Sequence, residues 1–249
     1  MSVRGSARSA LLLAGTGTRA VVSELDVSTG GRGVMVQCAT GPGEACPAGE
    51  PPDLALRRVR IVGAQTLGIG VDEAHAVIED ARIDGVSASG QLDGFGVVAV
   101  GARVEGARID VTGATRHAVL AYGAGASMDL RALQVLDTQP SPECEGEGCA
   151  RERAGNAITC AERATISLHD FVAERAAYAG LLMVQGCTTD VVERGRIMHN
   201  ALGVLTDGTV EQTPFVGIAV DQNGTDYQTT MLRVERPTFG SETSSTDAL

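Results

Sequence analysis

The chain has few aromatic residues and no lysine. Aromatic residues make up 3% of its 249 residues, tryptophan is absent, and all of its basic residues are arginines. Aromatic platforms of the kind that hold sugar rings therefore cannot be numerous. The formal net charge is −11, which argues against nucleic acid as a partner because phosphate binding requires a basic patch.

Long apolar runs and metal-binding spacings are also missing. No apolar stretch approaches the ~20 residues of a membrane-spanning helix. The apolar run at 10–14 is shorter than the ~7–15 residues of a signal-peptide core, so we read it as a strand. The six cysteines contain no C-x-x-C pair, and the four histidines lie far from them in the sequence. We therefore expect no metal site of the zinc type.

What the sequence does contain is a repeated unit of about 22–26 residues. Residues 96–101 and 117–123 are short apolar runs that each end in glycine. Each is followed by a segment of alternating polar and apolar residues, at 103–110 and 127–135. Three short strands per unit, separated by Gly, Ser, Thr or Asp corners, predict one coil of a parallel β-helix.

The unit length and the three strands per coil resemble the right-handed parallel β-helix of the pectate-lyase-like superfamily, over roughly residues 9–235. The resemblance implies an all-β, single-stranded solenoid of about eight coils. We expect it to occupy residues 1–239, with insertions near 38–53 and 138–154, and residues 240–249 to form a disordered tail. Since coil sequence begins at once, without a capping helix, we expect a fragment or a mis-assigned start.

Other architectures fit the period less well. A leucine-rich repeat would need an L-x-x-L-x-L frame with a fixed Asn, and we find no such frame. A propeller would need longer units. A plain β-sandwich is harder to exclude, but a repeat of about 22–26 residues disfavours it.

The most repeated local motif is Arg followed by Ile, and the segment Ala-Arg-Ile-Asp at 81–84 recurs at 107–110. Neighbours in a strand face opposite sides, so we expect Ile inside, with Arg over Arg and Asp over Asp outside. Because polysaccharide lyases and hydrolases belong to the superfamily, the candidate catalytic residues are Arg82, Asp84, Arg108 and Asp110. A lyase would add Ca²⁺. A solvated charged face is the favoured alternative, since no compact aspartate run or Gly-His-Gly is present.

One strand of each coil is apolar on both faces, which is unusual for a strand with one wet side. Two rows run across five coils, and one of them must face outward. The first row is Val98, Leu120, Ile158, Met183 and Leu205, and the second is Val97, Val119, Ala157, Leu182 and Val204. Either row would form a stripe about 20 Å long. Such a stripe indicates a contact surface, unless a loop or the C-terminal segment covers it.

The cysteines form local pairs, which favours disulfides and an oxidising compartment. We expect Cys38–Cys46 and Cys144–Cys149 to close the two insertions. Cys160 and Cys187 lie on adjacent coils, about 7–8 Å apart if both are in regular strands. That distance is beyond the usual reach of a bridge, although a corner would shorten it, so this pairing stays open.

Together these features predict an exported, non-enzymatic surface or scaffold protein, located outside the cell, on its surface or in the periplasm. It would bind a protein partner, a missing part of a longer chain, or a glycan through a sheet face. The alternative is a polysaccharide lyase or glycoside hydrolase that acts on an acidic polysaccharide. We expect no nucleic acid, no membrane span and no cofactor other than the Ca²⁺ of a lyase.

Overall fold

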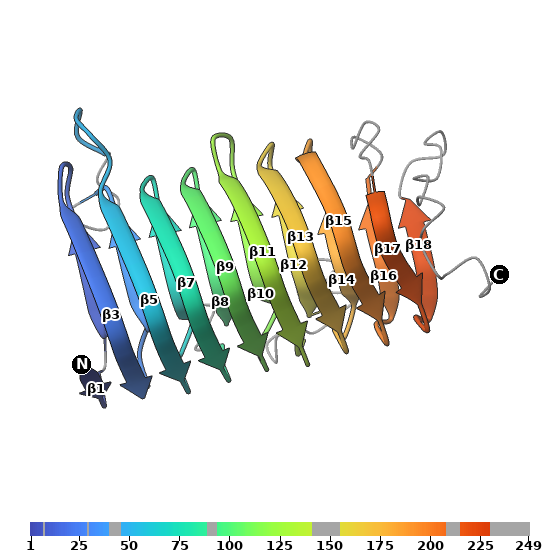
Figure 1. The fold of residues 1–249 in the computed structure, drawn as a ribbon, viewed down its shortest axis with the longest axis horizontal. Coiled ribbons are helices and arrows are strands. Elements are labelled where there is room, and N and C mark those ends of the chain that lie inside the picture. Colours follow the sequence, from blue (N-terminus) through green and yellow to red (C-terminus); the bar gives the residue numbers. More distant parts are fainter. Residues whose placement is uncertain are drawn as a thin grey trace.

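The structure is a computed structural model that describes residues 1–6, 8–28, 30–39, 46–88, 94–140, 155–207 and 215–229. Within these ranges all regular structure is strand and none is helix. The strands form two nine-stranded sheets in which all neighbours are parallel. The chain is thus an all-β solenoid of about eight turns (Figure 1), as the repeat predicts.

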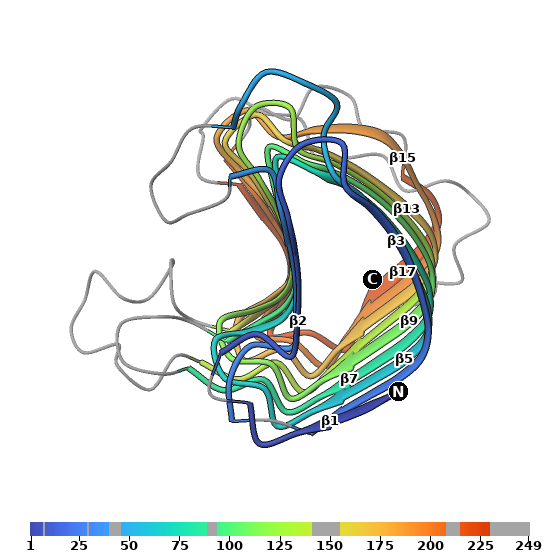
Figure 2. The same ribbon diagram turned by 90° about the vertical axis from the view of Figure 1, so that its left-hand side faces the viewer.

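Sheet A holds the long strands and sheet B the short ones. Sheet A consists of β1 (Ser2–Arg4), β3 (Arg19–Ser28), β5 (Asp53–Val62), β7 (His75–Asp84), β9 (Arg103–Thr112), β11 (Ser127–Leu136), β13 (Thr165–Glu174), β15 (Thr188–Met198) and β17 (Phe215–Asp221). Sheet B consists of β2 (Leu11–Ala14), β4 (Val34–Gln37), β6 (Leu67–Asp72), β8 (Phe95–Val100), β10 (His117–Tyr122), β12 (Asn156–Ala161), β14 (Ala179–Met183), β16 (Leu202–Thr206) and β18 (Thr225–Thr229). Viewed along the axis, the turns superimpose, with the two sheets on opposite sides (Figure 2).

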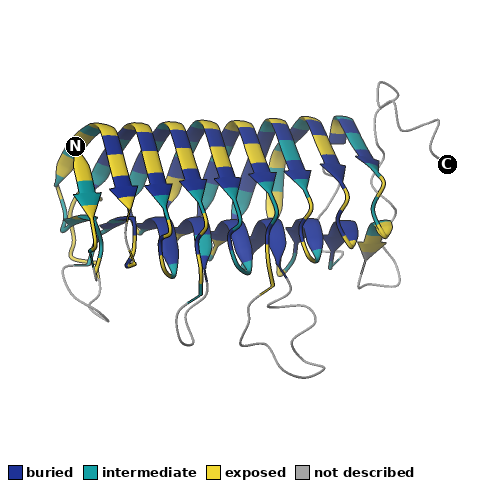
Figure 3. Cartoon of the chain, turned by 90° about the horizontal axis from the view of Figure 1, so that it is seen from below, coloured by how far each residue is buried: buried dark blue, intermediate teal, exposed yellow. Residues whose placement is uncertain are grey.

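Two of the three strands predicted for each coil are continuous with each other. The seven strands β3, β5, β7, β9, β11, β13 and β15 each bend near the middle at a residue with φ between 50° and 57°. These residues are Glu24, Arg58, Asp80, Arg108, Ala132, Asp170 and Arg194. In β7 the bend places two successive side chains, Glu79 and Asp80, on the outside, and the inward alternation then resumes. Sheet A therefore covers two sides of each coil, and stripes of buried and exposed residues cross it (Figure 3).

A sharp corner precedes each strand of sheet B. From β4 to β16 the register stacks only residues with no side chain or a methyl group at this corner, namely Gly33, Gly68, Gly96, Ala118, Ala157, Gly180 and Gly203, and Asp226 follows them in β18. A Cβ atom added at Gly96 would lie 2.4 Å from the carbonyl oxygen of Ala118. Because that contact is impossible, Gly96 accepts no side chain.

The solenoid interior is one continuous apolar core. Near its C-terminal end it also contains a hydrogen-bonded asparagine pair. The Asn200 Oδ1 accepts from the backbone N–H of Ala176 (2.8 Å), and its Nδ2 donates to the Ala173 carbonyl (3.2 Å) and to Asn223 Oδ1 (3.0 Å). Asn200 is 3% exposed, so these bonds satisfy corner backbone groups that water cannot reach.

Two disulfides lie within the described residues. Cys38–Cys46 is confirmed, with the Cα atoms 5.2 Å apart. Cys160–Cys187, the pairing left open by the sequence, is also bridged, with the Cα atoms 5.6 Å apart. The separation of about 7–8 Å for two regular strands does not apply here. Cys187 is not in a strand: it follows Gly186 in the turn between β14 and β15, which brings it beside Cys160 at the end of β12.

Several predictions fall wholly or partly outside the described residues. They are the Cys144–Cys149 pair, residues 40–45 of the first insertion, residues 141–154 of the second insertion and the tail at 240–249. Within the described ranges, no helix is long and apolar enough to cross a membrane.

Candidate functional site: a groove on the outer face of sheet B

The strand register decides which apolar row faces outward. The outer row is Val98, Leu120, Thr159, Leu182 and Leu205. The placement of Ile158 and Met183 in this row is therefore wrong. Ile158 pairs with Val119 and Met183 pairs with Cys160, and both side chains are 0% exposed in the main core. A shift of one residue moves a side chain to the opposite face.

The inward row is corrected in the same way. It consists of Val97, Val119, Ile158, Leu181 and Val204. Ala157 occupies the small-residue corner, and Leu182 belongs to the outer row. Three of the five residues predicted for each row are thus placed in the correct row.

The outer row forms the floor of a groove with a volume of about 610 Å³. Its aliphatic members are less exposed than the predicted stripe implies, at 3–8% of their surface. They pack into two small clusters that are separate from the main core: Leu67 and Phe95 flank Val98 and Leu120 in one, and Ala179, Leu202, Tyr178 and Val184 flank Leu182 and Leu205 in the other. The outer face of sheet B is therefore a hollow with a packed apolar floor.

A buried histidine supplies a polar group in this floor. The His117 side chain lies on β10 and its Nδ1 is 2.8 Å from Thr159 Oγ1 on β12. Its ring stacks on Phe95, with the ring centroids 5.9 Å apart. Burial, together with the charge of Arg116, lowers the pKa of His117 to about 3. The imidazole is thus neutral near pH 7, and Nε2 is the ring nitrogen left for a ligand.

The rim of the groove combines apolar and charged residues. Val100 and Tyr122 are the exposed apolar residues among those that line it. Arg116 lies where the strands begin, and Glu162 and Asp207 lie where they end. These three charges give the lining a net charge of −1.

Phe95, His117 and Thr159 were not singled out from the sequence. Thr159 is the one polar residue in the outer row, and it is visible only once the register is known. His117 immediately precedes the small-residue corner at Ala118. A column of Gly and Ala residues at this corner is the signal that would have identified the row.

The four candidate catalytic residues do not converge. Ala81 pairs with Ile109, so Arg82 stacks on Asp110, and the predicted stacking of Arg82 on Arg108 and of Asp84 on Asp110 is wrong. Arg82 does stack on another arginine, Arg60 of β5. The Arg82 Nε donates to Asp84 Oδ2 of its own strand, at 2.9 Å. Arg108 occupies the bend and instead pairs with Asp80. All four residues belong to sheet A, and none of them lines the groove.

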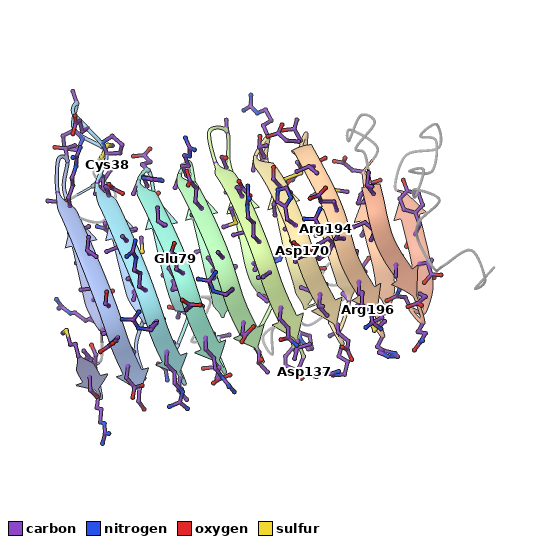
Figure 4. All side chains as sticks on the ribbon, in the orientation of Figure 1. Cys38, Glu79, Asp137, Asp170, Arg194 and Arg196 are labelled. Carbon is purple, nitrogen blue, oxygen red and sulfur yellow. A yellow bond between two sulfur atoms is a disulfide. The ribbon has the colours of Figure 1, made fainter. Side chains whose placement is uncertain are left out.

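The bends of sheet A carry a row of ion pairs between coils. Glu24 pairs with Arg58 (3.0 Å), Asp80 with Arg108, and Asp170 with Arg194 (2.7 Å; Figure 4). The hydrogen bond from Arg194 lowers the pKa of Asp170. Because these side chains are exposed, solvent screens the pairs, and they contribute little to stability. We interpret this face as a solvated charged surface.

Within the described residues, one group has the spacing of a metal site. It consists of Cys38, Cys46 and Glu73. The two cysteines are joined in a disulfide, so they offer no thiolate to a metal.

Comparison with known proteins assigns neither a family nor a function to the chain. No protein family, curated protein or solved structure matches this chain. The pectate-lyase-like superfamily therefore stays a resemblance based on the repeat, whereas the β-solenoid itself is observed.

Proposed function

We propose that the chain is an exported, non-enzymatic binding protein that engages its partner through the outer face of sheet B. The observation that supports this function is the groove of about 610 Å³, with its aliphatic row and its neutral histidine. Pockets of this size, with mostly apolar walls and a few polar groups, are typical ligand sites.

Export is supported by the disulfides. Cys38–Cys46 and Cys160–Cys187 are bridged, and such bridges persist mainly in extracellular and periplasmic compartments. An extracellular, surface or periplasmic location is part of the proposal.

The chemistry of the groove favours an apolar partner over a glycan. Its floor consists of aliphatic side chains, and its two aromatic residues are Phe95, which stacks on His117, and Tyr122 on the rim. A glycan would bury hydroxyl groups against a floor that offers few hydrogen bonds, and this is costly. Apolar side chains of a protein partner carry no hydroxyl groups and avoid this cost.

The enzyme alternative has no supporting observation among the described residues. Arg82, Asp84, Arg108 and Asp110 lie on sheet A and form exposed pairs or stacks. Catalysis by paired carboxylates requires two of them to face one bound sugar, and the groove offers Glu162 and Asp207 only at its rim.

Photo-crosslinking in the organism that encodes the chain tests the proposed surface. Tyr122 is replaced by a photoreactive phenylalanine analogue, which keeps an aromatic ring on the rim. Tyr122 is 43% exposed, and Val216 on sheet A, at 47%, gives a matched control position. We expect one dominant adduct from position 122 and none of the same mass from position 216.

Two outcomes would overturn the proposed surface. One is the absence of an adduct from position 122 in folded, exported protein. The other is the same adducts from both positions, which would show contact without preference for the groove. Digestion of the adduct with protease separates a protein partner from a smaller ligand.

A further inference from the structure

The first coil carries the most exposed apolar side chains of the described residues. They are Val21 at 73%, Met1 at 70% and Leu12 at 55%. The inward side chains of this coil pack against the core but stay only partly buried, namely Val3, Ala10, Leu11, Leu13, Ala20 and Val22. In the next coil, Val34 and Val36 at the equivalent positions are 0% exposed. Exposed apolar surface of this kind indicates a contact site.

Two strand edges are open at the same end of the solenoid. In sheet B, β2 is the last strand and has β4 as its neighbour on one side only. In sheet A, β1 pairs with Asp26–Ser28 alone, so the first half of β3 also has a neighbour on one side only. An open edge offers free backbone groups to another strand, and charged residues or proline commonly protect such edges. β2 has neither, since its sequence is Leu-Leu-Leu-Ala.

The two ends of the solenoid differ in charge. Residues 1–23 contain three arginines and no acidic residue, whereas residues 215–229 contain two aspartates and no basic residue. These segments lie at opposite ends of the solenoid (Figure 1). Among the described residues, neither Arg4 nor Asp221 has an ion-pair partner, and the Asp221 Oδ1 makes no hydrogen bond. The ends are therefore electrostatically complementary to each other.

The strand register brings these groups into line. The column of paired residues that starts at Arg4 runs through sheet A to Asp221, and the inward column that starts at Val3 runs to Val220. Both sheets contain nine strands. A second copy stacked in the same register would therefore continue both sheets at once, with an arginine beside an aspartate and a valine beside a valine.

We infer that the N-terminal end of the solenoid binds the C-terminal end of a second copy of this chain. β1 then pairs with β17 of the second copy, and β2 pairs with its β18. The place beside the first half of β3 is left for the chain of the second copy beyond Thr229, which lies outside the described residues. This inference goes beyond the proposed function and does not depend on the groove.

The contact joins two different surfaces, so each copy keeps one free end. Association of this kind produces a filament unless the copies close into a ring. Because each copy adds nine strands to each sheet, the filament repeats about every 43 Å along its axis. Contact between two N-terminal ends would instead bring arginines against arginines, which opposes association.

Engineered disulfides test the register of the contact. The outward column from Ser2 ends at Ala219, so these residues of two stacked copies lie about 4.8 Å apart, within reach of a disulfide. We expect the double variant Ser2→Cys and Ala219→Cys to form a ladder of covalent oligomers on a non-reducing gel. The pair Ser2→Cys and Val216→Cys is the control, because Val216 lies at the other end of β17, and we expect no ladder from it.

Three results of this experiment would overturn the inference. They are no ladder from the Ser2 and Ala219 pair, an equal ladder from the control pair, and a dimer from Ser2→Cys alone. The last result would show contact between two N-terminal ends.

Charge exchange tests the same contact by sedimentation velocity, at about 0.15 M salt to screen repulsion between distant charges. We expect the unchanged chain to assemble as its concentration rises. Arg4→Asp and Asp221→Arg should each raise the concentration required for assembly at least tenfold. Mixing the two variants should restore assembly, because each supplies the end that complements the other. Arg60→Asp is the control, since Arg60 is exposed in the middle of sheet A, and it should assemble like the unchanged chain.

Leu12→Lys provides a second variant that does not alter the ion pair. Leu12 is exposed and lies on the open edge of β2, so a lysine there is compatible with the fold and protects the edge. We expect it to prevent assembly at concentrations at which the unchanged chain assembles. A chain that stays monomeric at every concentration, or variants at Arg4 and Leu12 that assemble like the unchanged chain, would overturn the inference.

Discussion

Replacing both Cys160 and Cys187 with alanine should lower the free energy of unfolding by about 3–4 kcal/mol. The bridge closes a loop with a sequence separation of 27. Constraining a loop of this length removes about that much conformational freedom from the unfolded chain in the chain-entropy description. Both side chains are 0% exposed, so the bridge also joins two neighbouring coils inside the core.

Urea unfolding under non-reducing conditions measures this effect. The control is the double replacement of Cys38 and Cys46, whose sequence separation is 8. We expect a loss smaller by about 1 kcal/mol there, because a shorter loop constrains the unfolded chain less. An unchanged midpoint for the Cys160/Cys187 variant would show that this bridge does not form.

Asn200→Ala should destabilise the C-terminal coils by about 3 kcal/mol. The substitution removes the Asn200 bonds to Ala176, Ala173 and Asn223. It leaves buried backbone groups without partners, which costs about 1–3 kcal/mol for each group. Thermal and urea unfolding of the purified variant give the magnitude.

Asn156→Ala is the matched control for this substitution. Asn156 is equally buried, but its Oδ1 accepts one longer bond, 3.3 Å from the N–H of Ala179, and its Nδ2 has no partner. We expect a loss of about 1 kcal/mol. Equal losses at both positions would contradict a special role for the Asn200 network.

The fold class could be predicted from the sequence because a solenoid repeats its constraints. Each coil must place apolar side chains inward and turn at the same points. The period of about 22–26 residues therefore stays visible even though the amino acids differ from coil to coil. The bends of sheet A were not predicted, because residues as different as Glu24, Arg108 and Ala132 occupy them with positive φ. No residue type marks that position.

The register was harder to predict than the fold. The segments at 81–84 and 107–110 share four residues, yet Ala81 pairs with Ile109. Outward residues are weakly constrained, so a short motif can recur out of register. In sheet B, both faces of each strand are apolar, so the sequence did not show that Ile158 and Met183 lie one residue out of step with the outer row.

The candidate site could be predicted only in part. The sequence indicates an apolar outer row on one strand of each coil, and Val98, Leu120 and Leu205 do lie in it. It gives no sign that flanking side chains from neighbouring coils bury most of that row, or that His117 reaches Thr159 on the neighbouring strand. These features depend on contacts between residues distant in the sequence.

Methyl NMR with a soluble paramagnetic agent tests the claim that the groove is the binding surface most directly. Before ligand is added, the methyl signals of Leu182 and Leu205 should broaden, whereas the core residues Leu168 and Leu181 should not. Addition of the ligand that crosslinks at Tyr122 should remove the broadening from Leu182 and Leu205 alone. Protection that appears instead on Val216 of sheet A, with the groove still broadened, would contradict the claim.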